Sequence, residues 1–176
     1  MKMNKTLLLG GARSGKSELA EMLCIASGYQ PVYLATATIT DSQFAERINK
    51  HKARRGQSWI LVEETIEIAS VISSAQSKQI ILIDCLTLWL SNLIHHEKDF
   101  ECYLQELCNA IALCKAHLVF VSSEVGWGIH PQTAIGRTFR DKAGYMHQAV
   151  ARLCANVALV VAGLPMMLKG QLPPYD

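Results

Sequence analysis

The stretch Gly10-Gly11-Ala12-Arg13-Ser14-Gly15-Lys16-Ser17 decides how this sequence is interpreted. It fits the pattern G-x-x-x-x-G-K-[ST], whose glycines let the backbone curl so that successive N–H groups point at phosphate oxygens. An apolar strand is predicted before it, at residues 6–9, and a helix after it, at residues 17–26. We therefore expect Lys16 to reach the β- and γ-phosphates of a nucleoside triphosphate and the Ser17 hydroxyl to bind Mg²⁺. The alternative is a chance glycine-rich turn before a helix.

Strands and helices alternate along the rest of the chain, and the strands are apolar on both faces. This pattern is typical of a mostly parallel sheet covered by helices. We expect an α/β fold of the P-loop type, with helices on both faces of the sheet, in a single domain spanning residues 1–176. Further strands are predicted at residues 32–37, 59–63, 79–84, 118–122 and 157–162; further helices at 66–75, 86–94, 100–111 and 137–155 and from Thr40 onward; and a glycine-rich loop at 124–136.

Composition excludes several other classes of protein. The chain has 176 residues, of which 50% are apolar and 18% charged, and its formal net charge is +2. That balance argues against a dedicated nucleic-acid binder. No apolar run approaches the roughly 20 residues of a membrane span, and the N-terminus has no secretory pattern. The six cysteines lack metal-ligand or disulfide spacing, which predicts a cytoplasmic protein.

A carboxylate is expected to complete the Mg²⁺ site. Metal ions held by a phosphate loop usually have an acidic ligand at the end of a neighbouring strand. Asp84 closes the apolar run at residues 80–83 and is the best candidate. The alternative role for Asp84 is the N-cap of the helix that begins near Leu86, and the two roles are compatible.

A histidine lies in the middle of a strongly basic segment. His51 is surrounded by five cations within residues 47–55, and on a helix positions 47, 51 and 55 would share one face. The simpler interpretation is a solvated basic face with a histidine that has no chemical role. In the other interpretation, neighbouring positive charge keeps His51 neutral, so that its imidazole can attack phosphorus and form a phosphoramidate.

Several ordered motifs resemble one known family. They are Gly10-Gly11-Ala12-Arg13-Ser14-Gly15-Lys16-Ser17, Tyr33-Leu34-Ala35-Thr36-Ala37, Arg47-Ile48-Asn49-Lys50-His51-Lys52, Trp59 with Glu63, Asp84-Cys85-Leu86-Thr87-Leu88-Trp89-Leu90-Ser91-Asn92-Leu93, Glu124-Val125-Gly126-Trp127-Gly128-Ile129 and Arg137-Thr138-Phe139-Arg140-Asp141-Lys142-Ala143-Gly144. Over nearly the whole chain the sequence resembles the bifunctional adenosylcobinamide kinase/adenosylcobinamide-phosphate guanylyltransferases of cobalamin biosynthesis.

The resemblance implies two reactions. ATP or GTP phosphorylates the hydroxyl of adenosylcobinamide, and GMP from GTP then passes through a covalent histidine intermediate to adenosylcobinamide phosphate. His51 stands at the family's guanylylated position, and the family is typically a homotrimer. The residues implied to line the guanine nucleotide site are Ala35, Thr36, Ala37, Lys52, Ala53, Arg54, Arg55, Glu63 and Asp84. A plain P-loop kinase of small molecules, without guanylyl transfer, remains the alternative. A third hypothesis is a nucleotide-dependent switch whose bound state is recognised by a protein partner.

Some positions depart from the family pattern. Ser123, His130 and His147 stand where the family usually has Asn, Val and Asn. We expect His130 to lie in a loop and His147 on a helix surface, neither with a catalytic role. Trp127 is expected either to offer a flat apolar surface to the corrinoid or to pack in a core or subunit interface.

Overall fold

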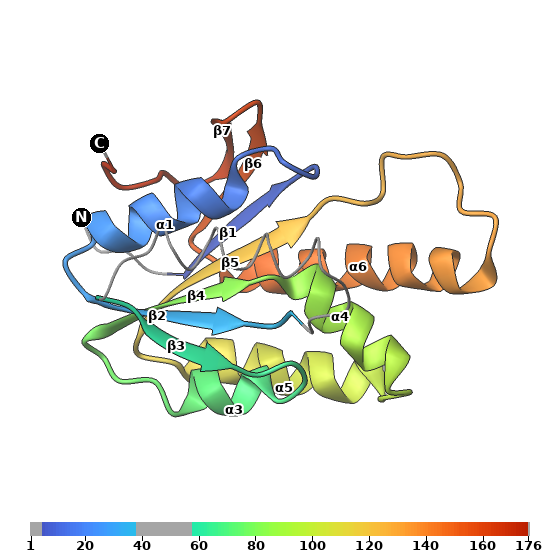
Figure 1. Ribbon diagram of the computed structural model, residues 1–176, viewed down its shortest axis with the longest axis horizontal. Coiled ribbons are helices and arrows are strands. Elements are labelled where there is room, and N and C mark those ends of the chain that lie inside the picture. Colours follow the sequence, from blue (N-terminus) through green and yellow to red (C-terminus); the bar gives the residue numbers. More distant parts are fainter. Residues whose placement is uncertain (1–4, 38–57, 176) are drawn as a thin grey trace.

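A seven-stranded sheet with strand order β3-β2-β4-β5-β1-β6-β7 forms the centre of the molecule (Figure 1). The computed structural model describes residues 5–37 and 58–175. All strand pairs are parallel except β6 with β7, which is antiparallel. The strands are β1 (Lys5–Gly10), β2 (Gln30–Ala35), β3 (Ile60–Glu63), β4 (Gln79–Asp84), β5 (His117–Ser123), β6 (Asn156–Val161) and β7 (Leu164–Lys169), and the helices α1 (Lys16–Ala26), α3 (Ile68–Ser73), α4 (Leu86–His95), α5 (Phe100–Leu113) and α6 (Ala134–Leu153).

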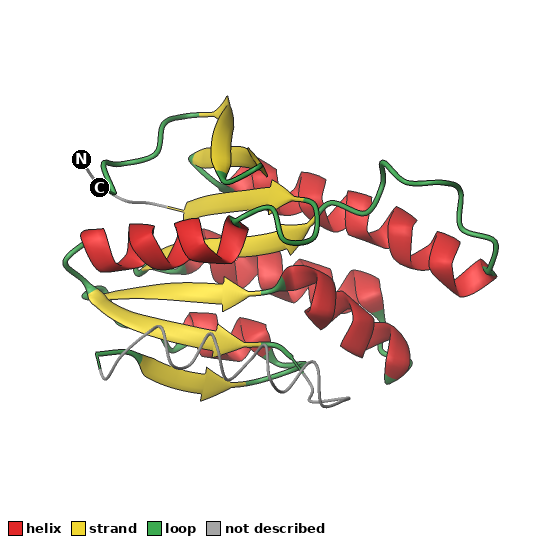
Figure 2. Ribbon diagram, turned by 45° about the horizontal axis from the view of Figure 1, so that its top comes forward, coloured by secondary structure: helices red, strands yellow, loops and turns green. Residues whose placement is uncertain are grey.

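Helices cover both faces of the sheet, as the alternation predicted. Helix α1 packs on one face, and α3, α4, α5 and α6 pack on the other (Figure 2). Successive residues of a strand point to opposite faces, so Leu7 belongs to one buried cluster and Leu8 to the other. The two-sided apolar strands therefore follow from a sheet enclosed between two helical layers.

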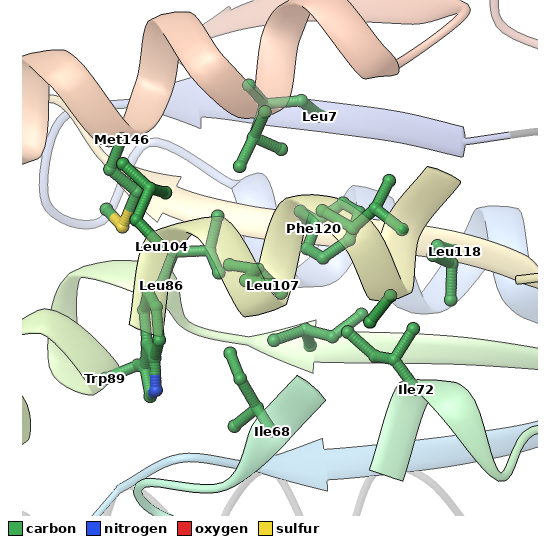
Figure 3. Close-up of a cluster of buried hydrophobic side chains, with 14 of the residues drawn as sticks. Leu7, Ile68, Ile72, Leu86, Trp89, Leu104, Leu107, Leu118, Phe120 and Met146 are labelled. Carbon is green, nitrogen blue, oxygen red and sulfur yellow. The ribbon is translucent and has the colours of Figure 1, made fainter. Parts of the chain in front are cut away.

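The larger core lies between the sheet and the four helices α3 to α6. Leu7 and Phe120 of the strands belong to one buried cluster with Leu107 of α5 and Trp89 of α4 (Figure 3). The Trp89 ring is 1% exposed, and its Nε1 donates to the Ile66 carbonyl at 2.8 Å. This bond satisfies the polar atom of a buried aromatic ring, so α4 is fixed both by apolar contact and by a hydrogen bond.

Within the described residues, the predicted elements agree with the structure except at two places. Helix α6 begins at Ala134 rather than at residue 137, because the Thr133 side chain accepts a hydrogen bond from the Gly136 amide and caps the helix there. Strand β7 was not predicted. It follows β6 through a two-residue turn, Ala162-Gly163, with positive φ at both positions, as tight hairpins require. The helix expected from Thr40 lies outside the described residues.

Among the described residues, no helix is both long and apolar enough to cross a membrane.

Candidate nucleotide-binding site

The carboxyl ends of the parallel strands bring most of the predicted site residues to one edge of the sheet. Gly10 ends β1, Ala35 ends β2, Glu63 ends β3 and Asp84 ends β4. Ala35 is paired with both Glu63 and Asp84 in the sheet. Ligands of open α/β sheets bind at this edge, so the fold places the phosphate loop and these side chains where one nucleotide could meet them.

Lys16 is held over the phosphate loop. Its side chain is only 6% exposed, and its Nζ donates to the Gly11 carbonyl at 2.5 Å and to Ser14 Oγ at 3.4 Å. A buried ammonium needs such partners, and phosphate oxygens are stronger ones than a carbonyl. The geometry thus keeps a cation ready at the position where the motif predicts the β- and γ-phosphates.

The backbone of the phosphate loop packs closely against the segment at the end of β6 and the β6–β7 turn. Gly10 has φ +154°, and a β-carbon there would lie 2.7 Å from Ser14 Oγ and against the Val160 carbonyl, so the position accepts only glycine. The Ser14 carbonyl accepts a hydrogen bond of 2.8 Å from the Gly163 amide in the β6–β7 turn. The unpredicted hairpin therefore supports the loop from outside the motif.

Helix α1 begins directly after the loop. Its N-cap is Gly15, and Lys16 and Ser17 form its first turn. The first amides of a helix have no carbonyl partner within the helix, and together with the macrodipole they attract anions. Ser17 is half-buried in this turn, with a hydroxyl oxygen of the hard type that Mg²⁺ prefers. Gly11, Ala12 and Arg13 are exposed at the loop tip, and Arg13 has a positive φ of 57°.

Asp84 lies at the same edge, but not on the strand beside β1. It pairs with Val121 of β5, and Val121 pairs with Leu8, so β5 separates Asp84 from the phosphate loop. Two strand spacings are about 10 Å, a span that a metal ion with its phosphate and water ligands can bridge. Asp84 accepts a hydrogen bond of 2.9 Å from Tyr33 Oη.

The N-cap role considered for Asp84 is wrong. Helix α4 is capped at Cys85, and the segment enters the helix one residue later than an Asp84 cap would require. The Asp84 carboxylate is instead directed to Tyr33, at the end of the sheet. The metal-ligand role of Asp84 stays a prediction.

Thr36 joins the ends of β2 and β4. Its hydroxyl donates to the Cys85 carbonyl and accepts from the Cys85 amide, both at 2.8 Å, and the residue is fully buried. Asn92 of α4 donates to the Thr36 carbonyl at 2.8 Å. The Thr36 hydroxyl thus both donates and accepts a hydrogen bond within the protein. Ala35 and Ala37 beside it are half-buried at the edge of the sheet.

Glu63 is exposed at the end of β3, an outer strand of the sheet. The remaining predicted residues, namely His51, Lys52, Ala53, Arg54 and Arg55, lie outside the described residues.

One polar cluster was not predicted from the sequence, because His147 was expected on a helix surface. That expectation is wrong: His147 is 7% exposed, and its Nε2 lies 2.7 Å from the Oγ of buried Ser122. Its Nδ1 lies 3.7 Å from Glu124 Oε2. Burial lowers the pKa of His147, and the Glu124 carboxylate opposes that shift only in part. The helical spacing from buried Ala143 to His147 and Val150 could have revealed this position.

The other two residues singled out in this region are on the surface. His130 is exposed in the loop, as expected, and its Nδ1 lies 2.8 Å from Arg140 Nη1. Trp127 is 76% exposed, so it does not pack in the core of this chain. A cavity of about 370 Å³ lies between α4 and α6 and is lined by Ser91, Ile94, His95, Ile135, Gly136 and Phe139.

Comparison with known proteins decides the family. The family described as "Cobinamide kinase / cobinamide phosphate guanyltransferase" matches residues 6–168. The bifunctional adenosylcobalamin biosynthesis protein CobP of Pseudomonas aeruginosa is 41% identical over 170 residues, covering 95% of this chain and 98% of the relative. The chain belongs to this family. Its CobU relative from Escherichia coli K12 is 34% identical over 179 residues, covering 93% and 98% of the two chains.

Membership establishes the class of the protein. The cobinamide kinase / cobinamide phosphate guanyltransferase family is named for two transfer reactions, so this chain is an enzyme, a transferase of cobalamin biosynthesis. The resemblance inferred from the motifs is confirmed.

Solved structures support the fold alone. The flagellar accessory protein FlaH of Methanocaldococcus jannaschii has a TM-score of 0.53 at 12% identity, over 98% of this chain and 82% of that one. The ATPase EscN of enteropathogenic E. coli has a TM-score of 0.54 at 12% identity, over 90% of this chain and 43% of that one. The predicted P-loop type of α/β fold is thereby confirmed.

Proposed function

We propose that this enzyme phosphorylates adenosylcobinamide with ATP or GTP. It then transfers GMP from GTP, through a covalent GMP on His51, to adenosylcobinamide phosphate, giving adenosylcobinamide-GDP. The observation that carries the proposal is the phosphate loop, with Lys16 buried over it at the same sheet edge as Asp84, in a chain of this family.

In the kinase reaction the loop amides and Lys16 hold the β- and γ-phosphates. Charge on the transferring group is stabilised by these fixed donors, which act without reorganisation. Ser17 and Asp84 supply hydroxyl and carboxylate oxygens that suit Mg²⁺. When bound, Mg²⁺ would neutralise charge on the phosphates.

In the transferase reaction a neutral imidazole of His51 attacks the α-phosphorus of GTP. A bond from nitrogen to phosphorus forms, and pyrophosphate leaves. A phosphate oxygen of adenosylcobinamide phosphate then attacks the same phosphorus, and the imidazole leaves. We assign the nucleotide contacts in this step to Ala35, Thr36, Ala37, Lys52, Ala53, Arg54, Arg55, Glu63 and Asp84. A homotrimer in the cytoplasm is part of the same proposal.

The test is labelling of the protein with α-³²P-GTP in the presence of Mg²⁺. The proposal predicts a label on wild-type protein that is stable to base and labile to acid, as a phosphoramidate is, and no label on His51→Ala. Transfer of γ-phosphate to adenosylcobinamide without any α-label would instead identify a plain small-molecule kinase, the alternative function.

A further inference from the structure

A buried chain of polar side chains ends beside the phosphate loop. Ser122 and Glu124 lie at and just beyond the end of β5, and His147 of α6 lies between their side chains. The separations are 2.7 Å from Ser122 Oγ to Nε2 and 3.7 Å from Nδ1 to Glu124 Oε2. Buried polar groups in such a chain fix one another's orientation.

Serine, histidine and glutamate in this order resemble the triad of a hydrolase, but the accessibility excludes that chemistry. Ser122 is 0% exposed and cannot reach an acyl group. The Glu124 side chain, by contrast, is 20% exposed, so the solvent-accessible end of the chain is the carboxylate. The arrangement therefore leaves the Glu124 carboxylate accessible to a substrate, while His147 and Ser122 are buried beneath it.

Glu124 is attached to the same part of the loop as Lys16. Its backbone amide donates to the Gly10 carbonyl at 2.9 Å, while Lys16 Nζ binds the carbonyl of Gly11. The carboxylate-bearing residue and the ammonium group are thus fastened to consecutive residues of the loop. A group that acts on the nucleophile of a phosphoryl transfer has to lie near the γ-phosphate, and Lys16 is the residue expected to contact that phosphate.

The carboxylate is held in a defined conformation. Glu124 Oε1 accepts a hydrogen bond of 2.6 Å from the Gly126 amide. Oε2 faces the His147 ring at 3.7 Å, beyond hydrogen-bond distance, which leaves its lone pairs able to accept a proton. One oxygen therefore anchors the group, and the other is available for chemistry.

We propose that Glu124 is the general base of the kinase step and that His147 and Ser122 are its positioning residues. This inference rests on the proposed function. As the cobinamide hydroxyl oxygen bonds to the γ-phosphorus, its proton passes to Glu124 Oε2. The bond between that phosphorus and the β–γ bridging oxygen breaks, and the nucleoside diphosphate leaves with both electrons. Glu124 then releases the proton to water.

The test measures two reactions separately on Glu124→Gln, which preserves shape and the oxygen that binds the Gly126 amide. The kinase kcat should fall about 100-fold or more, the range for loss of a general base. The KM for the nucleotide should stay within about threefold, because the variant keeps its ground-state contacts. Labelling by α-³²P-GTP should persist, since that step does not use the cobinamide hydroxyl. Glu101→Gln, on the exposed first turn of α5, is the matched control and should behave as wild type.

A second pair of variants tests the positioning role. His147→Asn keeps a polar group near the place of Nδ1, which lies 3.7 Å from Glu124 Oε2, and His147→Leu removes it at similar volume. We expect His147→Leu to lower the kinase kcat about tenfold at unchanged KM, as a small displacement of a catalytic group does, and His147→Asn to restore it. Equal losses in both variants, with lowered thermal stability, would show a purely structural role for His147 and overturn this part.

The outcomes separate the inference from the function on which it rests. A Glu124→Gln enzyme with kinase kcat within about threefold of an active wild type would overturn the general base alone. If Glu124→Gln lost kinase activity, α-labelling and nucleotide binding all at once, the general base would also be overturned, since the residue would then be structural. A wild-type protein that binds GTP but never phosphorylates adenosylcobinamide would overturn the proposed function and this inference with it.

Discussion

Single residues of the phosphate loop carry distinct parts of the account. Lys16 supplies charge, and its contacts with the Gly11 carbonyl and Ser14 Oγ place the ammonium over the loop. Gly10 supplies space, since a β-carbon there would meet the Val160 carbonyl. The two roles are separable by experiment because one changes catalysis and the other changes stability.

Lys16→Ala removes the cation expected at the β- and γ-phosphates. We expect the kinase kcat to fall at least about 100-fold, the scale of losing one fixed electrostatic donor to the transferring group. The fold should persist, as measured by circular dichroism, because the lysine's partners are loop groups rather than core side chains. Near-normal turnover in this variant would refute the assignment of the phosphate loop.

Gly10→Ala should unfold more easily than wild type. The added methyl would overlap a backbone carbonyl that cannot move freely, and overpacking of this kind costs about 1–3 kcal/mol. Gly11→Ala is the control, since a β-carbon there meets nothing within 4 Å and the free energy of unfolding should change by less than about 0.5 kcal/mol. Chemical denaturation measures both, and equal stability of the two variants would contradict the geometry described at Gly10.

At the scale of elements, the segments that follow the strands are joined by hydrogen bonds outside the sheet ladders, from a side chain in one case and from the backbone in another. The Thr36 hydroxyl ties the segment after β2 to the start of α4 through both backbone groups of Cys85. The Glu124 amide ties the segment after β5 to the end of β1. These bonds fix the relative positions of the loops that form the candidate site.

Thr36→Val tests the first of these ties. Valine keeps the shape of threonine but leaves a buried carbonyl and a buried amide of Cys85 without their partner, at about 1–3 kcal/mol for each group. We expect a loss of about 2–4 kcal/mol in the free energy of unfolding, measured by urea titration. Thr36→Ser retains the hydroxyl and should recover most of the loss. A Thr36→Val protein as stable as wild type would contradict the stabilising role assigned to the hydroxyl.

For the whole molecule, local patterns in the sequence predicted the helices, the strands and a parallel sheet, but not the order of the strands. The apolar runs and the glycine-rich loop predicted strands, helices and a parallel sheet, and hence the edge at which Gly10 and Asp84 end. Strand order depends on pairings between distant segments, so the position of β5 between Asp84 and the loop could not be derived. Strand β7 alternates only weakly in burial and follows an Ala-Gly turn without a typical turn sequence.

The part of the candidate site formed by one contiguous motif was predictable from the sequence, whereas contacts between distant segments were not. The loop residues follow from one contiguous pattern. The contact of His147 with Ser122 joins two elements distant in sequence, and only the helical period of α6 indicated that this histidine is buried.

Burial of His147 also makes the stability of the whole molecule depend on pH. Its pKa is lowered in the folded state by desolvation, so the unfolded chain binds a proton more readily. The stabilising contribution is complete above the unfolded pKa, about 6.5, and is lost as pH falls below it. Between pH 7.5 and 5.5 the free energy of unfolding should therefore fall more steeply for wild type than for His147→Asn, by at most about 1.4 kcal/mol per pH unit. Parallel pH profiles of the two proteins would contradict a buried, neutral His147.

The central claim is that one histidine carries GMP between the two substrates. Mass spectrometry of protein incubated with GTP and Mg²⁺, digested under mildly basic conditions, tests it most directly. We predict a mass increase of one GMP on the peptide that contains His51, and its disappearance when adenosylcobinamide phosphate is added. No adduct on an enzyme that still forms adenosylcobinamide-GDP, or an adduct on another residue, would contradict the claim.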